Sequence, residues 1–277
     1  MTDSLKLLAV FPHPDDETLG LGSTLARYSA EGVETYLVCA TRGERGWFDS
    51  EGLNPGLEEV GRIREAELRC AAEHLGLREV TFLDYIDGEV DQADPEEIIG
   101  KIVSDIRRIK PHVVVTFGPD GAYGHPDHIA LSQFTTGALM CAADEHFVDR
   151  NVQPPHRVWK FYYMVDSLDI VQAAKETFGG ISMDVEGVTR THVGWEEWQI
   201  TTRLNNNEYL NKVQKAMLCH KSQLPGYGPI AEWSLAQLGT IFGIGNFYRA
   251  FSLVNGGRQI ETDLFEGLRE FGGMTKF

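Results

Sequence analysis

The feature that most constrains this chain is an apolar run that ends in a turn rich in ionisable side chains. Leu5–Phe11 is almost continuously apolar, His13–Glu17 supplies one imidazole and three carboxylates, and Thr18–Glu31 is helix-like. Such a run before a helix is typical of a buried parallel strand, and open α/β sheets carry their active sites at the carboxyl ends of these strands. The turn therefore predicts ligands for a divalent metal, although helix capping by Asp15 or Asp16 is a simpler explanation.

A second stretch favours the metal site over simple capping. His112–Phe117 predicts another buried strand, and the Gly- and Pro-rich segment Gly118–His128 that follows it contains His125 and His128. A helix-like segment, Ile129–Ala143, comes next. Two strand ends that supply complementary ligands indicate one shared site at the same edge of a sheet.

Strand-like and helix-like segments alternate through the first half of the chain, which predicts an α/β fold. We expect further strands at Val33–Ala40 and Val80–Leu83, and helices at Glu58–Leu75, ended by Gly76, and at Pro95–Ile109. This alternation is typical of a Rossmann-like, mostly parallel sheet with helices on both faces. The expected core-facing stripe of the 58–75 helix is Val60, Ile63, Ala66, Cys70, Ala71 and Leu75.

The pattern is weaker after about residue 150. Trp159–Val165 predicts a strand, Gly179–Trp198 is hard to assign, Asn205–Cys219 is helix-like, and we expect loops around shorter elements in Leu224–Gly245. No repeat, low-complexity tract or linker divides the chain. We therefore expect one domain over residues 1–277, with a Rossmann-like core in 1–150 and a C-terminal elaboration in 151–277 that shapes the substrate pocket.

The charge balance restricts the partners of the chain. Its 41 acidic and 25 basic residues give a formal net charge of -16, which repels nucleic acid and anionic membrane surfaces. The expected partner is a small polar molecule, and association into a homo-oligomer is left open. Residues 1–11 lack a basic n-region, a cleavage pattern and a membrane-spanning apolar stretch, so we expect a cytoplasmic protein.

The four cysteines are far apart in the sequence. Cys39, Cys70, Cys141 and Cys219 lie in apolar or helix-like surroundings and form no Cys-x-x-Cys pair. We expect buried free thiols rather than a metal cluster or a disulfide framework.

His13, Asp16 and His128 form a ligand set typical of catalytic zinc, which takes three protein ligands and keeps an open position for water. Zinc lowers the pKa of its bound water from 15.7 toward roughly 7, so that hydroxide forms at neutral pH. Asp15 is adjacent to Asp16 but directed differently. It is the expected general base.

His125 and Tyr123 are expected on the opposite side of the reacting group. Pro126 suits the first position of a helix, which places His125 at the cap and His128 one turn on, so that both imidazoles face one pocket. We expect the surrounding carboxylates to keep His125 cationic, so that it stabilises an oxyanion or protonates a leaving amine. Tyr123 is expected to donate a further hydrogen bond, with an ordinary half-buried aromatic as the alternative.

Basic residues near predicted strand ends are candidates for binding the substrate. Arg42 and Arg45 follow the second strand, and Arg64 lies in the 58–75 helix. Solvated surface charge is the alternative for the loop arginines. Asp87-Gly88 is primarily a turn signal, with a role for Asp87 in the substrate pocket as the alternative.

Two motifs together resemble the LmbE-like, or GlcNAc-PI de-N-acetylase (PIG-L), family of zinc-dependent N-deacetylases. They are His13–Glu17 and Tyr123–His128. The resemblance covers most of residues 5–143 and resumes near 200–223. Further similarities are Gly20–Ala26, Arg64 with Glu67, Leu75-Gly76 and His220–Gln223.

The resemblance implies a Rossmann-like fold and a hydrolase that removes the N-acetyl group from a glucosamine-containing small molecule. It implies zinc on His13, Asp16 and His128, with Asp15 as the base and His125 and Tyr123 around the oxyanion. Trp198–Arg203 is similar to the mycothiol-related deacetylases and amidases, whereas Gly179–Trp195 departs from the family pattern.

Other functions are weighed against this one. A zinc amidase that cleaves a larger acyl group from a glucosamine conjugate, and a non-catalytic metal-binding protein of the same fold, are the alternatives, and iron(II) is the alternative metal. A nucleotide-binding protein is disfavoured because Gly20-Leu21-Gly22 lacks the spaced third glycine and no P-loop motif occurs. The chain also lacks a Gly-x-Ser-x-Gly elbow and a His-Glu-x-x-His helix, which disfavours serine hydrolases and zincins.

Overall fold

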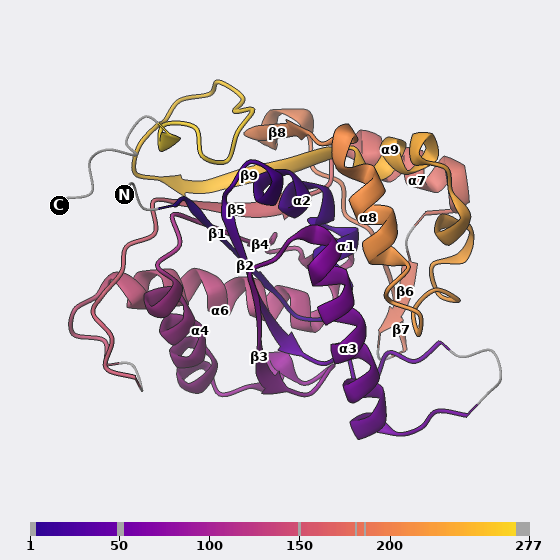
Figure 1. The fold of residues 1–277 in the computed structure, drawn as a ribbon, viewed down its shortest axis with the longest axis horizontal. Helices are drawn as coiled ribbons and strands as arrows, with labels where there is room; N and C mark the ends of the chain where they lie inside the picture. Colours follow the sequence, from indigo (N-terminus) through magenta and orange to yellow (C-terminus); the bar gives the residue numbers. More distant parts are fainter. Residues whose placement is uncertain (1–3, 49–52, 149–150, 181, 186, 270–277) are drawn as a thin grey trace.

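The centre of the fold is a mixed sheet whose strand order is β3-β2-β1-β4-β5-β9-β8 (Figure 1). The computed structural model describes residues 4–48, 53–148, 151–180, 182–185 and 187–269. Strands β1 to β5 are parallel, β9 is antiparallel to β5, and β8 is antiparallel to β9. The predicted α/β fold with a mostly parallel sheet is confirmed. The strands are β1 (Lys6–Phe11), β2 (Glu34–Thr41), β3 (Glu79–Tyr85), β4 (Val113–Phe117), β5 (Lys160–Val165), β8 (Thr202–Asn205) and β9 (Ile244–Ser252), with a separate hairpin of β6 (Ser182–Val185) and β7 (Val188–Thr191).

Helices cover both faces of the sheet, as the alternating pattern predicts (Figure 1). Side chains at alternate positions of β1 point to opposite faces. Leu7 and Phe11 pack on the side of α2, α3 and α8, and Leu8 and Val10 pack on the side of α4 and α6. The helices are α1 (Asp16–Leu19), α2 (Gly22–Ala30), α3 (Leu57–Leu75), α4 (Pro95–Ile109), α5 (Gly121–Gly124), α6 (Pro126–Ala143), α7 (Leu168–Phe178), α8 (Leu210–Met217) and α9 (Leu235–Phe242), with short 3-10 turns η1 (Val90–Gln92), η2 (Glu197–Gln199), η3 (Asn207–Tyr209) and η4 (Gly228–Glu232).

Most predicted elements of the first half are confirmed within a few residues. The prediction of one continuous helix over Thr18–Glu31 is wrong. The chain forms α1 and then α2, with the break at Gly20 and Leu21. A Cβ added at Gly20 would lie 2.3 Å from the Cε atom of Met164 on β5. Glycine leaves room for the Met164 side chain here, and glycine also weakens a helix.

The second half differs more from the prediction. β9 begins inside the segment expected to form loops, and β8 includes Asn205, the first residue of an expected helix. Strand β8 lies at the edge of the sheet and β9 lies next to it, and the partly exposed side chains of both strands obscure the apolar pattern. The hairpin of β6 and β7 lies within the stretch that had no assignment, and residues 270–277 of the predicted C-terminal elaboration lie outside the described residues.

The buried face of α3 is rotated from the predicted stripe. Ala66 and Cys70 are exposed, and the buried positions include Gly61, Arg64 and Glu67. Because the buried face of the helix includes polar side chains, it does not coincide with the apolar stripe in the sequence. The apolar pattern alone could not predict this face.

The prediction of four free thiols is also wrong. Cys70 on α3 and Cys219 after α8 form a disulfide with Cα atoms 5.8 Å apart. Cys39 is a buried free thiol and Cys141 is a half-buried one. Sequence spacing could not reveal the pair, because 149 positions separate its members.

A buried carboxylate joins β8 and β9 to β5. Glu261 is 2% exposed, and its Oε1 lies 2.6 Å from Nζ of the fully buried Lys160. Its Oε2 accepts hydrogen bonds from Tyr162 on β5 and Thr202 on β8, each at 2.7 Å. Arg249 on β9 pairs with the same carboxylate at 2.8 Å. One side chain thus links three strands.

No helix of the described residues combines the length and the apolar character needed to cross a membrane.

Replacing Glu261 by Ala should lower the free energy of unfolding by about 3–5 kcal/mol, because Lys160 is left buried without its counter-charge. The matched control is Glu197→Ala, which breaks an exposed pair with Arg203 and should cost less than about 1 kcal/mol. Urea unfolding of both variants measures this difference. Equal, small losses would show that the buried network does not stabilise the fold.

Candidate active site

Three loops meet at the carboxyl edge of the sheet. His13–Glu17 follows β1, Asp87 follows β3, and Gly118–His128 follows β4. Asp15 has a φ of 111°, and its carbonyl accepts the first hydrogen bonds of α1 from the N–H groups of Thr18 and Leu19. A positive φ is rare for an Asp and separates its side chain from that of Asp16. The two adjacent carboxylates therefore occupy different places in the site.

The predicted metal ligands His13, Asp16 and His128 lie together. His13 Nδ1 is 3.3 Å from His128 Nε2 and 3.4 Å from Asp16 Oδ2, and His128 Nε2 is 3.7 Å from Asp16 Oδ1. A tetrahedral zinc with bonds of 2.0–2.1 Å separates its ligand atoms by roughly 3.3 Å. The three atoms thus fit around one ion, and the donor set of two imidazoles and a carboxylate suits a divalent metal.

The far side of the His13 ring explains why Nδ1 can serve as a ligand. His13 Nε2 lies 3.0 Å from Asp87 Oδ1 and 3.1 Å from Asp127 Oδ2. An ionised carboxylate can only accept, so Nε2 carries the proton and Nδ1 is left to bind a metal. Asp127 is held in turn by the backbone N–H groups of Gly88 at 2.7 Å and Val90 at 3.1 Å.

These contacts also set the charge states. Burial by itself raises the pKa of Asp87 and of Asp127, but the adjacent His13 outweighs it and leaves both pKa values below normal. Burial lowers the pKa of His13, yet Asp87, Asp127 and Asp16 together raise it well above 6.5, so a metal that binds at Nδ1 would displace the second proton of the ring. Burial lowers the pKa of His128 to about 3, so its ring is neutral, and it stacks on Phe117 with centroids 4.2 Å apart.

Asp15 lies beside the ligand set but is held by other partners. Its Oδ2 is 3.3 Å from Nη2 of Arg64 and accepts a hydrogen bond from the Tyr227 hydroxyl, also at 3.3 Å. Burial raises the pKa of Asp15 to about 6, although Arg64 opposes the shift. A carboxylate with such a pKa can both take and return a proton near neutral pH.

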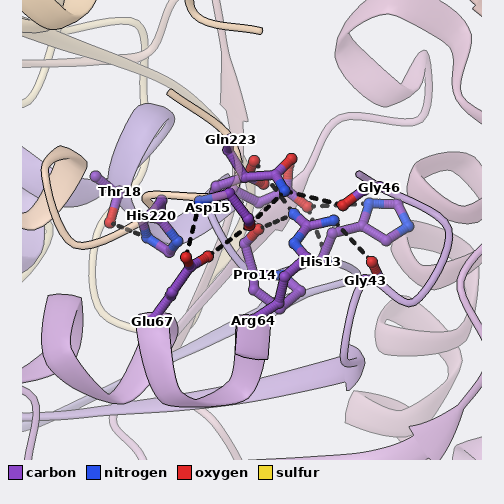
Figure 2. A network of polar contacts seen from close by, with 12 residues as sticks. His13, Pro14, Asp15, Thr18, Gly43, Gly46, Arg64, Glu67, His220 and Gln223 are labelled. Carbon is purple, nitrogen blue, oxygen red and sulfur yellow. Dashed lines mark hydrogen bonds and ion pairs between the residues drawn. The ribbon is translucent and has the colours of Figure 1, made fainter. Parts of the chain in front are cut away.

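Arg64 is a buried residue that contacts two loops of the site. It is 3% exposed, and its guanidinium donates to the carbonyls of Gly43 and Pro14 (Figure 2). A Cβ at Gly43 or Gly46 would lie 2.3 or 2.1 Å from its Nη1, so the loop after β2 closes over the guanidinium. These contacts give Arg64 a positioning role, because its guanidinium holds both loops and Asp15, and its predicted contact with substrate stays a prediction.

Arg42 and Arg45 are not brought into the cluster either. The Arg42 guanidinium pairs with Glu65 and Asp84 and lies over the Phe82 ring. That of Arg45 pairs with Glu89. The surface-charge alternative describes the two loop arginines better than substrate binding does. Asp87, in contrast, reaches the site, but it contacts His13.

His125 lies at the cap of α6 as predicted, but the expected cationic state is wrong. Its Nδ1 accepts the N–H of Asp127 at 3.2 Å, which requires an unprotonated Nδ1. Burial and the neighbouring His13 lower the pKa of His125. The neutral ring keeps its Nε2–H as a donor. The Tyr123 ring lies 5.9 Å from that of His125, and burial raises the pKa of its hydroxyl, which stays protonated.

Several residues of the site were not assigned a role from the sequence. His220 and Glu17 are fully buried and 3.1 Å apart, and Glu17 Oε2 accepts the N–H of Asp15 at 2.9 Å. Ser222 donates to Glu67, and Gln223 donates to the Gly46 carbonyl at 2.9 Å. The signal that could have found these residues is the resemblance to the family, which includes Glu17, Glu67 and the segment His220–Gln223.

The β6–β7 hairpin adds a further residue that the sequence did not indicate. Val193 N donates to the Ala122 carbonyl at 2.7 Å, which places the end of the hairpin against the Tyr123–His125 loop. The Arg190 guanidinium lies next to Gly124, and its buried Nε has no hydrogen-bond partner. Arg190 and Gly124 are far apart in the sequence, so the sequence does not reveal this contact.

Comparisons with known proteins identify relatives of this chain. The sequence pattern of the GlcNAc-PI de-N-acetylase (PIG-L) family matches residues 8–139. The 1D-myo-inositol 2-acetamido-2-deoxy-alpha-D-glucopyranoside deacetylase of Rhodococcus opacus is 36% identical over 188 residues, 61% of this chain and 64% of that protein. The protein of the same name from Streptomyces avermitilis is 32% identical over an alignment that covers 95% of this chain and 97% of that protein. The chain belongs to this family.

A solved structure has a similar fold. N,N'-diacetylchitobiose deacetylase from Pyrococcus horikoshii matches with a TM-score of 0.67 at 22% identity, over 89% of this chain and 84% of that one. This likeness supports the fold. Membership of the PIG-L family confirms the predicted class of enzyme, a metal-dependent N-deacetylase that hydrolyses amide bonds.

Asp127→Asn should weaken metal binding about 10–100-fold, because His13 loses an anionic partner that holds its ring and tautomer. Asp120→Asn is the control, since Asp120 contacts Ala122 and Trp195 instead. Competition with a fluorescent chelator measures both affinities. An unchanged affinity in Asp127→Asn would mean that the carboxylate does not support the ligand.

Arg64→Lys should lower kcat by about tenfold or more with little change in KM, because a lysine cannot hold Pro14, Gly43 and Asp15 together and misplaces the loops. Arg62→Lys, an exposed change on the same helix, should leave both constants unaltered. Steady-state kinetics separates the two. A rise in KM alone would restore the substrate-binding role.

Proposed function

We propose that this protein removes the N-acetyl group from a small molecule that contains N-acetylglucosamine, with one divalent metal held by His13, Asp16 and His128. One observation carries the proposal. Three ligand atoms converge at the carboxyl edge of the sheet, and Asp15 lies beside them with separate partners. A three-ligand site next to a carboxylate outside the ligand set is the arrangement of a hydrolytic metal centre.

Zinc is the proposed metal, and iron(II) is the alternative. Two imidazoles and one carboxylate suit both ions. When bound, such an ion acts as a Lewis acid that polarises a carbonyl and lowers the pKa of water toward neutrality. The protein residues then orient the acetamide and handle its protons.

Asp15 is the proposed base. It accepts a proton from the water that attacks the acetamide carbon, and it returns this proton to the nitrogen as the C–N bond breaks, which gives acetate and a free amine. Its pKa of about 6 suits both transfers. Arg64 and Tyr227 keep the carboxylate oriented, and Glu17 holds its backbone.

His125 and Tyr123 are the proposed donors to the carbonyl oxygen. The neutral His125 ring offers Nε2–H, and Tyr123 offers its hydroxyl. Donors that are already in place stabilise the developing oxyanion without reorganisation. The stabilisation comes from hydrogen bonds, since His125 carries no charge.

The second half of the chain is proposed to shape the pocket as part of one domain. Tyr227 reaches Asp15, His220 reaches Glu17, and the β6–β7 hairpin lies against the catalytic loop. Arg190, which has no acidic partner among the described residues, is the candidate contact for the part of the substrate beyond the sugar.

The relatives indicate which substrate to test first. Their names specify an acetamido-glucopyranoside of myo-inositol, and we propose a small glucosaminide of this kind. The net charge of -16 supports such a partner over nucleic acid or an anionic membrane surface. The cytoplasm is proposed as the compartment.

Asp15→Asn and Asp16→Asn should fail in different ways. Asp15→Asn should keep its metal and lose about 10²–10⁴ in kcat, because the amide cannot accept the proton of the attacking water. Asp16→Asn should lose both metal affinity and activity, because one of three protein ligands is weakened. Elemental analysis and amine release from a panel of N-acetylglucosaminides, measured together, give the test.

Two results would contradict the proposal. Metal loss in Asp15→Asn equal to that in Asp16→Asn would remove the division of roles. Metal-loaded wild type that releases no amine from any member of the panel would reject the substrate class.

A further inference from the structure

A second group of metal-ligating side chains lies outside the catalytic cluster. Cys70 and His74 are four positions apart on α3 and share one face of the helix, and Cys219 follows α8. The two sulfurs and one nitrogen of His74 all lie within 4.8 Å of one another. The two sulfurs are joined as a disulfide in the structure.

The group is open to solvent on one side. Cys70 and His74 are exposed, whereas Cys219 is 6% exposed. A reductant or an ion can therefore reach these side chains from the solvent-exposed side of α3 while the chain stays folded. The free thiols Cys39 and Cys141 belong to neither this group nor the catalytic cluster.

We propose that reduction of the Cys70–Cys219 disulfide creates a second metal site, in which both thiolates and the His74 imidazole bind a thiophilic divalent ion such as zinc. Two cysteines and one histidine form a known zinc ligand set, and thiolates select such ions over magnesium or calcium. The i, i+4 spacing of Cys70 and His74 places both ligands on the same face of α3.

The chemistry of the switch is simple. A dithiol reductant exchanges with the disulfide, so that the reductant is oxidised to its own disulfide and Cys70 and Cys219 each gain a thiol hydrogen. The bound ion then displaces the two thiol protons to solvent. Disulfide and metal exclude each other, because both use the same two sulfurs.

In the reduced state the metal site would link the 219–223 segment to α3, as the disulfide does in the oxidised state. Cys219 directly precedes His220, which contacts Glu17, and Ser222 contacts Glu67 on α3. Either link joins the 219–223 segment to α3, so a reduced protein with metal keeps this junction closed.

Cobalt(II) is the probe, because thiolate ligation gives it a sulfur-to-metal absorption band. Reduced wild type, freed of reductant without air, should bind one ion more per chain than oxidised wild type, and only the reduced form should show this band. Cys70→Ser and His74→Gln change exposed residues, so they should fold, and both should lose the additional ion. Cys141→Ser should keep it.

His13→Ala separates this inference from the proposed function. It should lose the catalytic ion and keep the thiolate band after reduction. The inference is overturned if reduced wild type binds no additional ion, or if Cys70→Ser or His74→Gln retains it with wild-type affinity.

Discussion

Two ionised carboxylates that accept from His13 Nε2 determine the chemistry of the centre. Asp87 and Asp127 lie 3.0 and 3.1 Å from that nitrogen and fix the proton on it. His13 Nδ1 must then face Asp16 and His128. The three loops at the sheet edge depend on this arrangement, because Asp127 also binds the backbone after β3. Ligand orientation and loop position therefore come from one set of contacts.

The base is separated from the ligands by backbone conformation. Asp15 and Asp16 are neighbours in sequence, and the φ of 111° at Asp15 turns one carboxylate away from the other. Such a conformation persists only where its surroundings enforce it. Glu17 holds the Asp15 N–H, and Arg64 holds both the Pro14 carbonyl and the Asp15 carboxylate. The buried Glu17–His220 pair brings the second half of the chain to the same point.

The sequence predicts the sheet, its parallel core and the meeting of His13, Asp16 and His128, because strand ends and ionisable turns are local signals. It misplaces residues whose roles depend on distant partners. Arg64 is predicted to bind substrate, but the sequence does not reveal that Gly43 and Gly46 close over its guanidinium. Cys70 is predicted to be buried, but it is exposed because α3 turns polar residues toward the core. Its disulfide partner Cys219 is 149 positions away in the sequence. The neutral state of His125 depends on its burial, on the neighbouring His13 and on the N–H of Asp127 that its Nδ1 accepts.

X-ray absorption of the zinc-loaded, oxidised protein tests the central claim most directly. The account predicts one zinc with two imidazole ligands and oxygen neighbours at about 2.0–2.2 Å, without sulfur. His128→Ala should reduce the imidazole scattering to that of a single ring. A wild-type spectrum with no imidazole scattering, or with sulfur neighbours in the oxidised protein, would contradict the assignment of His13, Asp16 and His128 as the ligands.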